Sequence, residues 1–423
     1  MKRRILAILL VAVLLMTAVI FAACDDSQQD ETEKDKGNAE PLGDDGKVKE
    51  SARLFAGQFA AKALDLGGNS AISPASIYMT LALAAACSQG ETQAEIVELL
   101  DIDIQTLESG IGAMANALSR ETKTSLLEVA NSVWTDKNID PIEEKLEGLT
   151  EKYSADVFSE DFLNDNAAAN GALREYVLEK SRGLIDHNFE LAEETLFVLM
   201  NVLYLKDNWG GNDLRFTEEE HVFKGANGDT TVKLLQGDYS LGKAYDGDGY
   251  SSFFTETIAG YRVTFILPDD GESPQSVMSA QTISGAISRE YVEVDSGKNE
   301  RYYTRCIFPE FSAGFDDDLS KILQKDFGVS ALFDDERCDL SPLLGENNGG
   351  YPNVRCPVMQ HIVKFNADEK GIEGAAVTYS PATSESVPEE ELVYADFVVD
   401  RAFGFVVSYD GYALFVGSVG SLE

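Results

Sequence analysis

The side chains that could carry acid–base or nucleophilic chemistry in this chain form no known catalytic pattern. The three histidines, His187, His221 and His361, lie in neither an H-E-x-x-H motif nor a nucleophile elbow. Residues 237–243 have the spacing of a phosphate loop, but Ala244 stands where a hydroxyl should hold magnesium. Carboxylate pairs are too abundant in this acidic chain to single out any one of them. We therefore predict no enzyme, no metal site and no cofactor.

One polar side chain lies where it must have partners. Residues 196–205 (LFVLMNVLYL) are apolar at nearly every position, which predicts a central strand that is buried on both faces. Asn201 interrupts this run, and a buried amide without a partner costs about 1–3 kcal/mol. We therefore expect other polar groups to lie against Asn201.

Periodicity predicts helices in the first half of the chain and strands in the second half. Ser73 and Pro74 are typical of a helix cap followed by a first-turn proline, and Asp410-Gly411 is typical of a hairpin turn. The expected helices cover about 52–66, 74–87, 92–100, 141–153 and 165–182. The further expected strands cover 261–267, 362–365, 396–399, 403–409 and 412–419. This order favours an α+β fold with large mixed sheets.

The N-terminus has the features of an export signal. Three basic residues precede an apolar run over residues 5–23, and Cys24 follows at once. The end of the run, Phe21-Ala22-Ala23-Cys24, resembles a bacterial lipobox. The resemblance implies that 1–23 are a lipoprotein signal peptide and that a lipidated Cys24 anchors the chain to a membrane at the cell surface, outside the cell. A plain signal peptide and an uncleaved anchor are the alternatives.

The remaining composition predicts a flexible tether and one large domain. Residues 24–48 hold almost no large apolar side chain, so we expect an acidic, flexible tether there and a single domain over 49–423. Asp and Glu outnumber Lys and Arg by 73 to 34, for a net charge of −39. Such a field repels nucleic acid, and we expect a monomer. The four cysteines at 87, 306, 338 and 356 allow three disulfide pairings, among which the sequence does not choose.

Six segments in order, from about residue 50 to the C-terminus, resemble the serpin family. They are 69–77 (NSAISPASI), 201–209 (NVLYLKDNW), 308–311 (FPEF), 323–341, 361–371 and 400–405 (DRAFGF). The resemblance implies the serpin fold, in which helices pack around large mixed β-sheets and a reactive-centre loop is exposed. It also implies a suicide-substrate inhibitor of serine endopeptidases, with cysteine endopeptidases as a further class of partner.

The resemblance also assigns roles to particular residues. Ser73, Ser76, Asn201 and His361 would form the shutter, the polar cluster at which two strands of the main sheet part to admit a third. The reactive-centre loop would cover about 369–399. Its hinge, which resembles E-x-G-T-E-A-A-A-A-T, comprises Glu369, Gly371, Ile372, Glu373, Gly374, Ala375 and Ala376. After cleavage the loop would insert into the main sheet and trap the acyl-enzyme.

An inserted strand would place alternate side chains on opposite faces of the sheet. The set from Ile372 to Ala382 in steps of two is small and mostly uncharged, so we expect it to face the core. The set from Glu373 to Thr383 carries the Glu and the Tyr, so we expect it to face solvent. Because Ile372 and Gly374 depart from the family's Thr and Ala, insertion could be slow. The alternative function is then a non-inhibitory serpin, either a protease substrate or an extracellular binding lipoprotein.

The length of the loop leaves the reactive bond open. Counting seventeen residues from Glu369, as the family does, places the bond at Glu385–Ser386. Counting back from Phe403 places it at Glu391–Leu392. Both counts put Glu before the cut, which predicts a target protease that accepts an acidic residue there. Cleavage after Tyr379 or Val387 is the alternative.

Overall fold

The computed structural model describes residues 43–192, 194–210, 214–295, 297–345, 350–351, 354–356, 359–373 and 391–422. The predicted signal peptide, Cys24, most of the predicted tether, Gly374 to Ala376 of the hinge, and the Glu385–Ser386 bond lie outside these residues. None of the helices in the described ranges combines the length and the apolar character that crossing a membrane requires.

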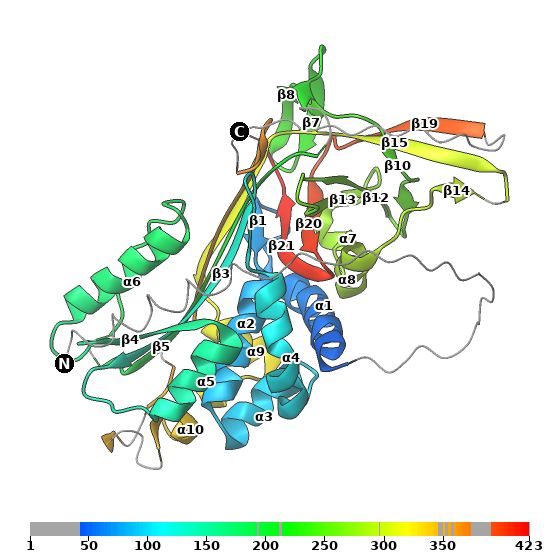
Figure 1. Ribbon diagram of the computed structural model, residues 1–423. Coiled ribbons are helices and arrows are strands. Elements are labelled where there is room, and N and C mark those ends of the chain that lie inside the picture. Colours follow the sequence, from blue (N-terminus) through cyan, green and yellow to red (C-terminus); the bar gives the residue numbers. More distant parts are fainter. Residues whose placement is uncertain are drawn as a thin grey trace, which may run out of the picture. The chain divides into compact units, whose positions relative to one another are not determined.

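The helices of the described part lie mostly in the first half of the chain and below the sheets in Figure 1. They are α1 Asp44–Ala63, α2 Pro74–Cys87, α3 Gly90–Leu99, α4 Ile104–Ala117, α5 Glu143–Tyr153, α6 Asn166–Lys180, α7 Pro274–Val277, α8 Ala280–Ser288, α9 Ser320–Phe327 and α10 Ser341–Leu344, with a 3₁₀ turn at Ala331–Phe333.

The strands follow a different distribution and dominate the second half. They are β1 Ser70–Ile72, β2 Arg120–Glu121, β3 Leu126–Asp136, β4 Ala155–Glu160, β5 Phe197–Asn208, β6 Arg215–Phe216, β7 His221–Gly225, β8 Gly228–Val232, β9 Leu235–Gln236, β10 Ser240–Leu241, β11 Tyr245–Asp246, β12 Tyr250–Glu256, β13 Arg262–Pro268, β14 Val294–Asp295, β15 Glu300–Phe308, β16 Phe311–Asp318, β17 Gln360–Ala367, β18 Gly371–Ile372, β19 Glu391–Val398, β20 Phe403–Tyr409 and β21 Tyr412–Val419.

Most strands belong to one continuous, bent sheet. Its order is β11-β12-β13-β20-β21-β1-β16-β17-β18-β5-β3-β2, with β4 added beside β3. A second sheet is built around β15, which pairs with β9, β10, β14 and β19, and the hairpin of β7 and β8 stands apart. The half of the large sheet from β16 to β2 is called the main sheet below. This mixture of packed helices and large mixed sheets confirms the predicted α+β class.

Local sequence signals account for the elements where they were expected. Ser73 caps α2 and accepts a hydrogen bond from the backbone N–H of Ser76 at 3.3 Å. Asp410 (φ 48°) and Gly411 (φ 79°) form the tight turn between β20 and β21, because such a turn requires two left-handed residues. The predicted boundary at residue 49 is wrong, since α1 begins at Asp44 and the side chain of Val48 is fully buried. Asp44 and Asp45 fit this first turn because carboxylates stabilise a helix N-terminus.

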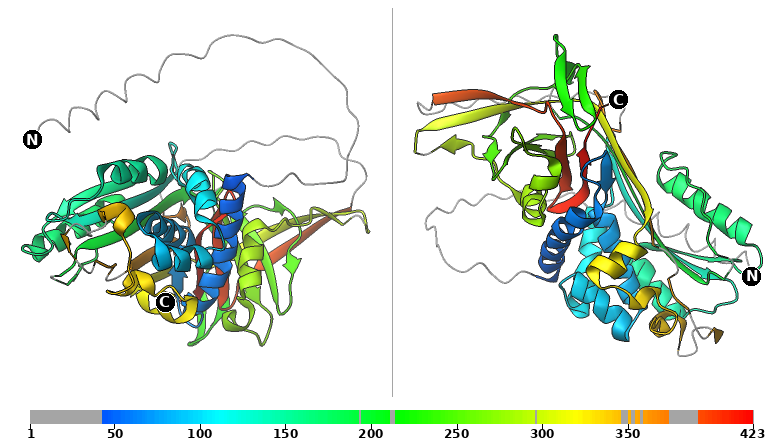
Figure 2. Two further views of the ribbon diagram at one scale, coloured as in Figure 1. Left: turned by 90° about the horizontal axis from the view of Figure 1, so that it is seen from below. Right: turned by 180° about the vertical axis from the view of Figure 1, so that it is seen from behind.

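The central strand β5 is buried on both faces, as predicted. One face packs into the core that contains α1 and α2, through Phe197, Leu199 and Leu205. The other face packs against α6 through Val198, Met200 and Val202. Figures 1 and 2 show α6 lying across this outer face of the main sheet. The helix predicted at 165–182 is therefore not free in solvent: Leu173 and Val177 are buried against the sheet.

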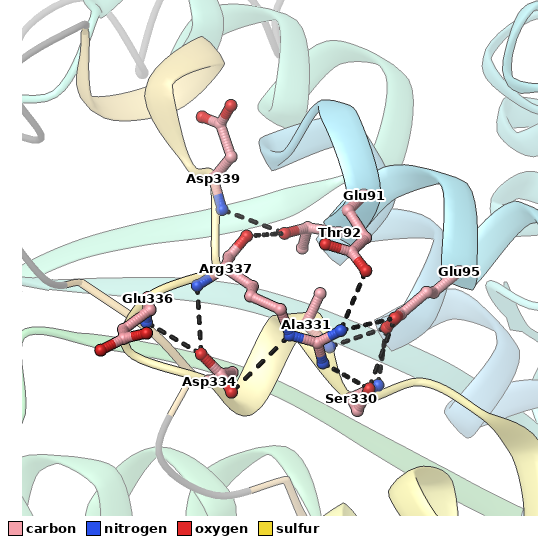
Figure 3. Close-up of polar contacts among 9 residues, drawn as sticks. All are labelled: Glu91, Thr92, Glu95, Ser330, Ala331, Asp334, Glu336, Arg337 and Asp339. Atoms are coloured by element: carbon pink, nitrogen blue, oxygen red, sulfur yellow. Dashed lines mark hydrogen bonds and ion pairs between the residues drawn. The ribbon is translucent and has the colours of Figure 1, made fainter.

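A buried carboxylate fastens α3 to the segment that follows α9 (Figure 3). The Glu95 side chain accepts hydrogen bonds from the backbone N–H groups of Ser330 and Ala331, each at 2.7 Å. The Arg337 guanidinium lies 3.4 Å from Glu95 and 2.9 Å from Glu91. These contacts satisfy the N–H groups that begin the 3₁₀ turn.

We expect Glu95→Ala to lower the free energy of unfolding by about 2–3 kcal/mol, because it removes two charge-assisted hydrogen bonds from a mostly buried site. Urea unfolding of the purified chain measures this loss. Glu91→Ala is the matched control. Its carboxylate is 56% exposed, so we expect a change below about 0.5 kcal/mol. Equal losses in the two variants would contradict the assignment.

Candidate functional site

The predicted partners of Asn201 are present under the main sheet. Ser76 Oγ at the start of α2 donates a hydrogen bond to Asn201 Oδ1. Asn201 Nδ2 donates in turn to Asn131 Oδ1 on β3, at 2.6 Å. Asn131 Nδ2 donates to the carbonyl oxygen of Tyr153 at 2.7 Å. The half-buried amide of Asn201 is thus held by a chain of hydrogen bonds that crosses two strands and reaches α2 and α5.

Asn131 was not among the residues that the sequence analysis selected. The signal for it was of the same kind as for Asn201: an amide inside a strand, β3, whose burial is nearly continuous. The register pairs Asn131 directly with Asn201 across β3 and β5, and only this pairing reveals that the two amides satisfy each other.

His361 on β17 forms the second half of the cluster. Its Nε2 accepts a hydrogen bond from the backbone N–H of Ser73 at 3.0 Å, so the ring must be neutral at this nitrogen. The ring is 6% exposed, and its burial lowers the pKa of His361 to about 3. Ser73, Ser76, Asn201 and His361 therefore lie together, and the N-terminus of α2 joins β5 to β17.

The hinge enters the main sheet for two residues. Strand β18 lies between β5 and β17, with Gly371 opposite Asn208, Ile372 opposite Asp207, and Ile372 also opposite Ala367. A Cβ on Gly371 would lie 2.1 Å from the carbonyl oxygen of Asp207, so this close approach requires glycine. Ile372 is 1% exposed and packs into the core, which is the face predicted for it.

Glu373 follows β18. Its backbone is left-handed (φ 46°), which is unfavourable for a residue other than glycine and differs from the extended conformation of a strand. Its carboxylate accepts a hydrogen bond from the Tyr204 hydroxyl at 2.9 Å. Partial burial raises the pKa of Glu373.

The turn that precedes β18 is fixed by its own hydrogen bonds. Asp368 Oδ1 accepts from the N–H groups of Lys370 (2.8 Å) and Gly371 (3.1 Å), and Trp209 Nε1 donates to the carbonyl oxygen of Asp368 at 2.7 Å. The backbone N–H of Glu369 donates to Glu310 Oε1 at 3.1 Å. Glu310 therefore meets the backbone of the hinge residue Glu369 and stabilises the turn.

Below β18, no strand of the described part of the chain lies between β5 and β17, and this space is called the slot. No strand pairing joins β5 to β17 directly, although both strands are described over their whole length. Beside this slot, on the α6 side, lies a cavity of about 20 Å³. Its lining comes from α6, the segment after α6, and both strands: Val177, Ile185, Phe189, Leu191, Val198, Leu199, Met200, Asn201, Val202, Gln360 and Ile362.

One prediction about the loop needs correction. The loop does not extend to residue 399, because Glu391 to Val398 form β19, paired along its whole length with β15. The alternative reactive bond, Glu391–Leu392, lies at the start of this strand. The side chains from Ala375 to Thr383, which are expected to face solvent after insertion, lie outside the described residues. On that face of β5, α6 covers Val198, Met200 and Val202, and sequence periodicity does not reveal which helix covers a sheet.

The described residues contain no group of three or more His, Cys, Asp or Glu side chains close enough to hold a metal ion. Cys87, Cys306 and Cys338 are free thiols, and burial raises the pKa of Cys87 to about 12.

Comparisons with known proteins agree with this geometry. A family model described as Serpin (serine protease inhibitor) matches residues 51–422. Serpin A3-5 of Bos taurus is 26% identical over 318 residues, which cover 73% of this chain and 74% of the bovine protein. Alpha-1-antiproteinase of Rattus norvegicus is 24% identical over 429 residues, 97% of each chain.

Solved structures show the same fold. The thermophilic serpin tengpin in its native state has a TM-score of 0.73 at 22% identity, covering 92% of this chain and 96% of tengpin. Human thyroxine-binding globulin, solved with its bound ligand, has a TM-score of 0.71 at 21% identity, covering 89% of this chain and 99% of the globulin. With a family model that spans nearly the whole described chain, an open main sheet and a hinge at its top, this protein belongs to the serpin family, whose members include inhibitors of proteases.

Proposed function

We propose that this serpin is a suicide-substrate inhibitor of serine endopeptidases, which traps the acyl-enzyme by inserting its cleaved loop between β5 and β17. The observation that carries the proposal is the open slot below β18, with the hinge already paired to both neighbouring strands. Because β18 is in register with both, further insertion needs no new alignment. It needs only that Glu373 leave its left-handed conformation and release the Tyr204 hydroxyl.

The register predicts where each loop residue would lie. Six residues beyond Ile372 is Thr378, six residues before Asp207 is Asn201, and six residues before Ala367 is His361. Continued insertion would therefore place Thr378 between the two halves of the shutter. Asn201 faces the core, so Thr378 would face it as well, within reach of both polar side chains.

Continued to the end of β5, the register places Ala382 opposite Phe197. Ten residues, 373–382, would then join the sheet, at about 1 kcal/mol per net hydrogen bond. The resulting ~10 kcal/mol is comparable with the whole stability of a domain, so insertion can do work on a trapped protease. A cut at Glu385–Ser386 leaves all ten residues free to insert, whereas a cut after Tyr379 does not. We therefore propose Glu385–Ser386 as the reactive bond, with a target that accepts an acidic residue.

Thr378→Val should lower the stability of the loop-cleaved form by about 1–2 kcal/mol and leave the uncleaved form unchanged, because the hydroxyl would meet the shutter only after insertion. Guanidinium unfolding of both forms measures the difference. Thr383→Val, on the opposite strand face, is the control and should change neither form. An equal loss in the uncleaved Thr378→Val protein would contradict the register.

The direct test mixes purified residues 43–423 with a panel of serine and cysteine proteases that includes a glutamate-specific one. A complex that survives denaturing electrophoresis supports trapping, and the first residue of the released C-terminal fragment identifies the reactive bond. Cleavage without a complex would mean that the hinge inserts too slowly, and would favour the substrate or binding alternative. A melting temperature that loop cleavage leaves nearly unchanged would mean that the loop does not insert at all.

We also propose that the chain is exported and anchored to a membrane through a lipid on Cys24, outside the cell. The support is the sequence alone: a basic start, an apolar run and the Phe21-Ala22-Ala23-Cys24 ending. Cys24→Ser in cells should prevent lipid labelling and release the protein from the membrane fraction. Unchanged membrane association of the variant would contradict lipidation.

A further inference from the structure

Strand β19, which directly follows the loop in the sequence, forms an arm together with β15. This arm projects from the rest of the second sheet. Strands β15 and β19 pair in parallel over eight positions, from Glu300 opposite Glu391 to Ile307 opposite Val398. Figure 1 shows both strands extending together beyond β10, and Figure 2 shows the same projection from behind. The described chain resumes at Glu391, directly after the loop, so the loop ends at the tip of this arm.

The two faces of the arm differ. Residues that are opposite in the register share a face, so Tyr302, Thr304 and Cys306 lie on one side with Phe397, and all four are buried. The other side carries a group that we call the tyrosine face: Tyr239, Tyr303, Arg305, Leu392 and Tyr394. Three of its apolar side chains are strongly exposed, Tyr394 at 58%, Leu392 at 51% and Tyr239 at 40%.

The side chains of the tyrosine face hold one another in place. The Tyr394 ring stacks on Tyr303 with centroids 5.4 Å apart, and meets Tyr239 edge-on at 5.2 Å. Arg305 lies over the Tyr239 ring at 4.9 Å and forms a two-bond ion pair with Asp396, at 3.0 and 2.9 Å. The Tyr239 hydroxyl donates to the same carboxylate at 3.2 Å.

Monomeric proteins usually bury rings of this kind. Because these contacts already fix the side chains, the tyrosine face would lose little side-chain entropy when a partner binds it. Tyrosine and arginine are also the residues that dominate the binding energy of protein interfaces. Arg305 is neutralised locally by Asp396. The tyrosine face therefore offers an aromatic surface, with Arg301 opposite Leu392 in the register, on a chain whose net charge is −39.

We propose that the tyrosine face is a docking surface for the body of the same protease that attacks the loop. This inference rests on the proposed function. Glu391 is six residues from Glu385, so the two lie at most ~20 Å apart. A protease domain of about 200 residues has a radius of gyration of about 16 Å. A protease whose active site holds the Glu385–Ser386 bond must therefore extend over the tip of the arm, where Leu392 and Tyr394 are exposed.

The test compares the double variant Tyr239→Ser/Tyr394→Ser with the wild type and with Tyr245→Ser. Tyr245 is a matched control, because it is a similarly exposed tyrosine (41%) on β11, outside the arm. The protease used is the member of the panel that cleaves the loop fastest, and the second-order rate constant of loop cleavage is measured under limiting protease. We expect the double variant to react at least tenfold more slowly and the control to remain within twofold of the wild type.

Leu392→Asp is a second variant at an exposed strand position, and it keeps the test decisive if the tyrosine variant folds poorly. A tenfold loss in Leu392→Asp supports the docking surface. Unchanged rates in both variants would overturn it while leaving inhibition intact. A dimer of the wild type that disappears in the double variant would place a second copy on this face and would also overturn it. If no protease of the panel cleaves the loop, both this inference and the proposed function fail.

Discussion

Replacing Ala376 by Glu should convert the protein from an inhibitor into a substrate, with at least a hundredfold loss of stable complex. The register that begins at β18 places residue 376 opposite Leu203 on β5 and Val363 on β17. Val363 is 5% exposed and belongs to the core. Insertion would then bury an unpaired carboxylate, which costs several kcal/mol. The acyl-enzyme would be hydrolysed before the loop could enter.

Ala375→Glu is the control, because it adds the same side chain to the neighbouring residue. The register places residue 375 on the opposite face, between Tyr204 and Lys364, and Lys364 is exposed. A carboxylate there stays hydrated next to a positive charge, so inhibition should be retained within a few-fold. Denaturing electrophoresis gives the ratio of complex to cleaved protein for both variants. Equal inhibition by the two would contradict the proposed register, and equal loss would show that charge alone is harmful.

Acidification should weaken the shutter through His361. The folded-state pKa of this buried ring is lowered to about 3, whereas an unfolded histidine titrates near 6.5. Between about pH 6.5 and pH 3, the imidazole of His361 therefore binds a proton in the unfolded chain but not in the folded chain. The contribution of His361 to stability is complete above about pH 6.5 and is lost progressively as the pH falls toward 3. The slope reaches 1.36 kcal/mol per pH unit only once the unfolded histidine is fully protonated, so we expect a loss of about 2 kcal/mol between pH 6.5 and 4.5.

His361→Gln isolates this effect from the carboxylates that also titrate on acidification. The Gln amide oxygen can still accept the hydrogen bond from the Ser73 backbone, but it takes up no proton. We expect the variant to be less stable than the wild type at pH 7, with a flatter loss toward pH 4.5. Urea unfolding across this range gives the two slopes. His221→Gln should keep the wild-type slope, and a wild-type slope in His361→Gln would assign the acid sensitivity to other groups.

The sequence by itself was enough for the fold class and for four members of the polar cluster at Asn201, although not for Asn131. Local capping, periodicity and turn chemistry located α2, β5 and the β20–β21 hairpin, because these signals lie within a few consecutive residues. The apolar residues on both sides of Asn201 in the sequence were enough to predict that its amide has polar partners. The resemblance to serpins then named Ser73, Ser76 and His361, and all of them lie in the cluster.

The placement of the hinge was decided by tertiary structure. No local signal reveals that Glu373 accepts a hydrogen bond from Tyr204, which is distant in sequence and meets Glu373 where β18 pairs with β5. The local pattern predicted a strand only over 396–399, and the pairing of Glu391 to Val398 with β15 extends it into the arm. The pairing of strands, and the covering of a sheet by α6, join segments far apart in the chain. A local pattern shows which face a residue prefers, and only the folded chain determines what that face meets.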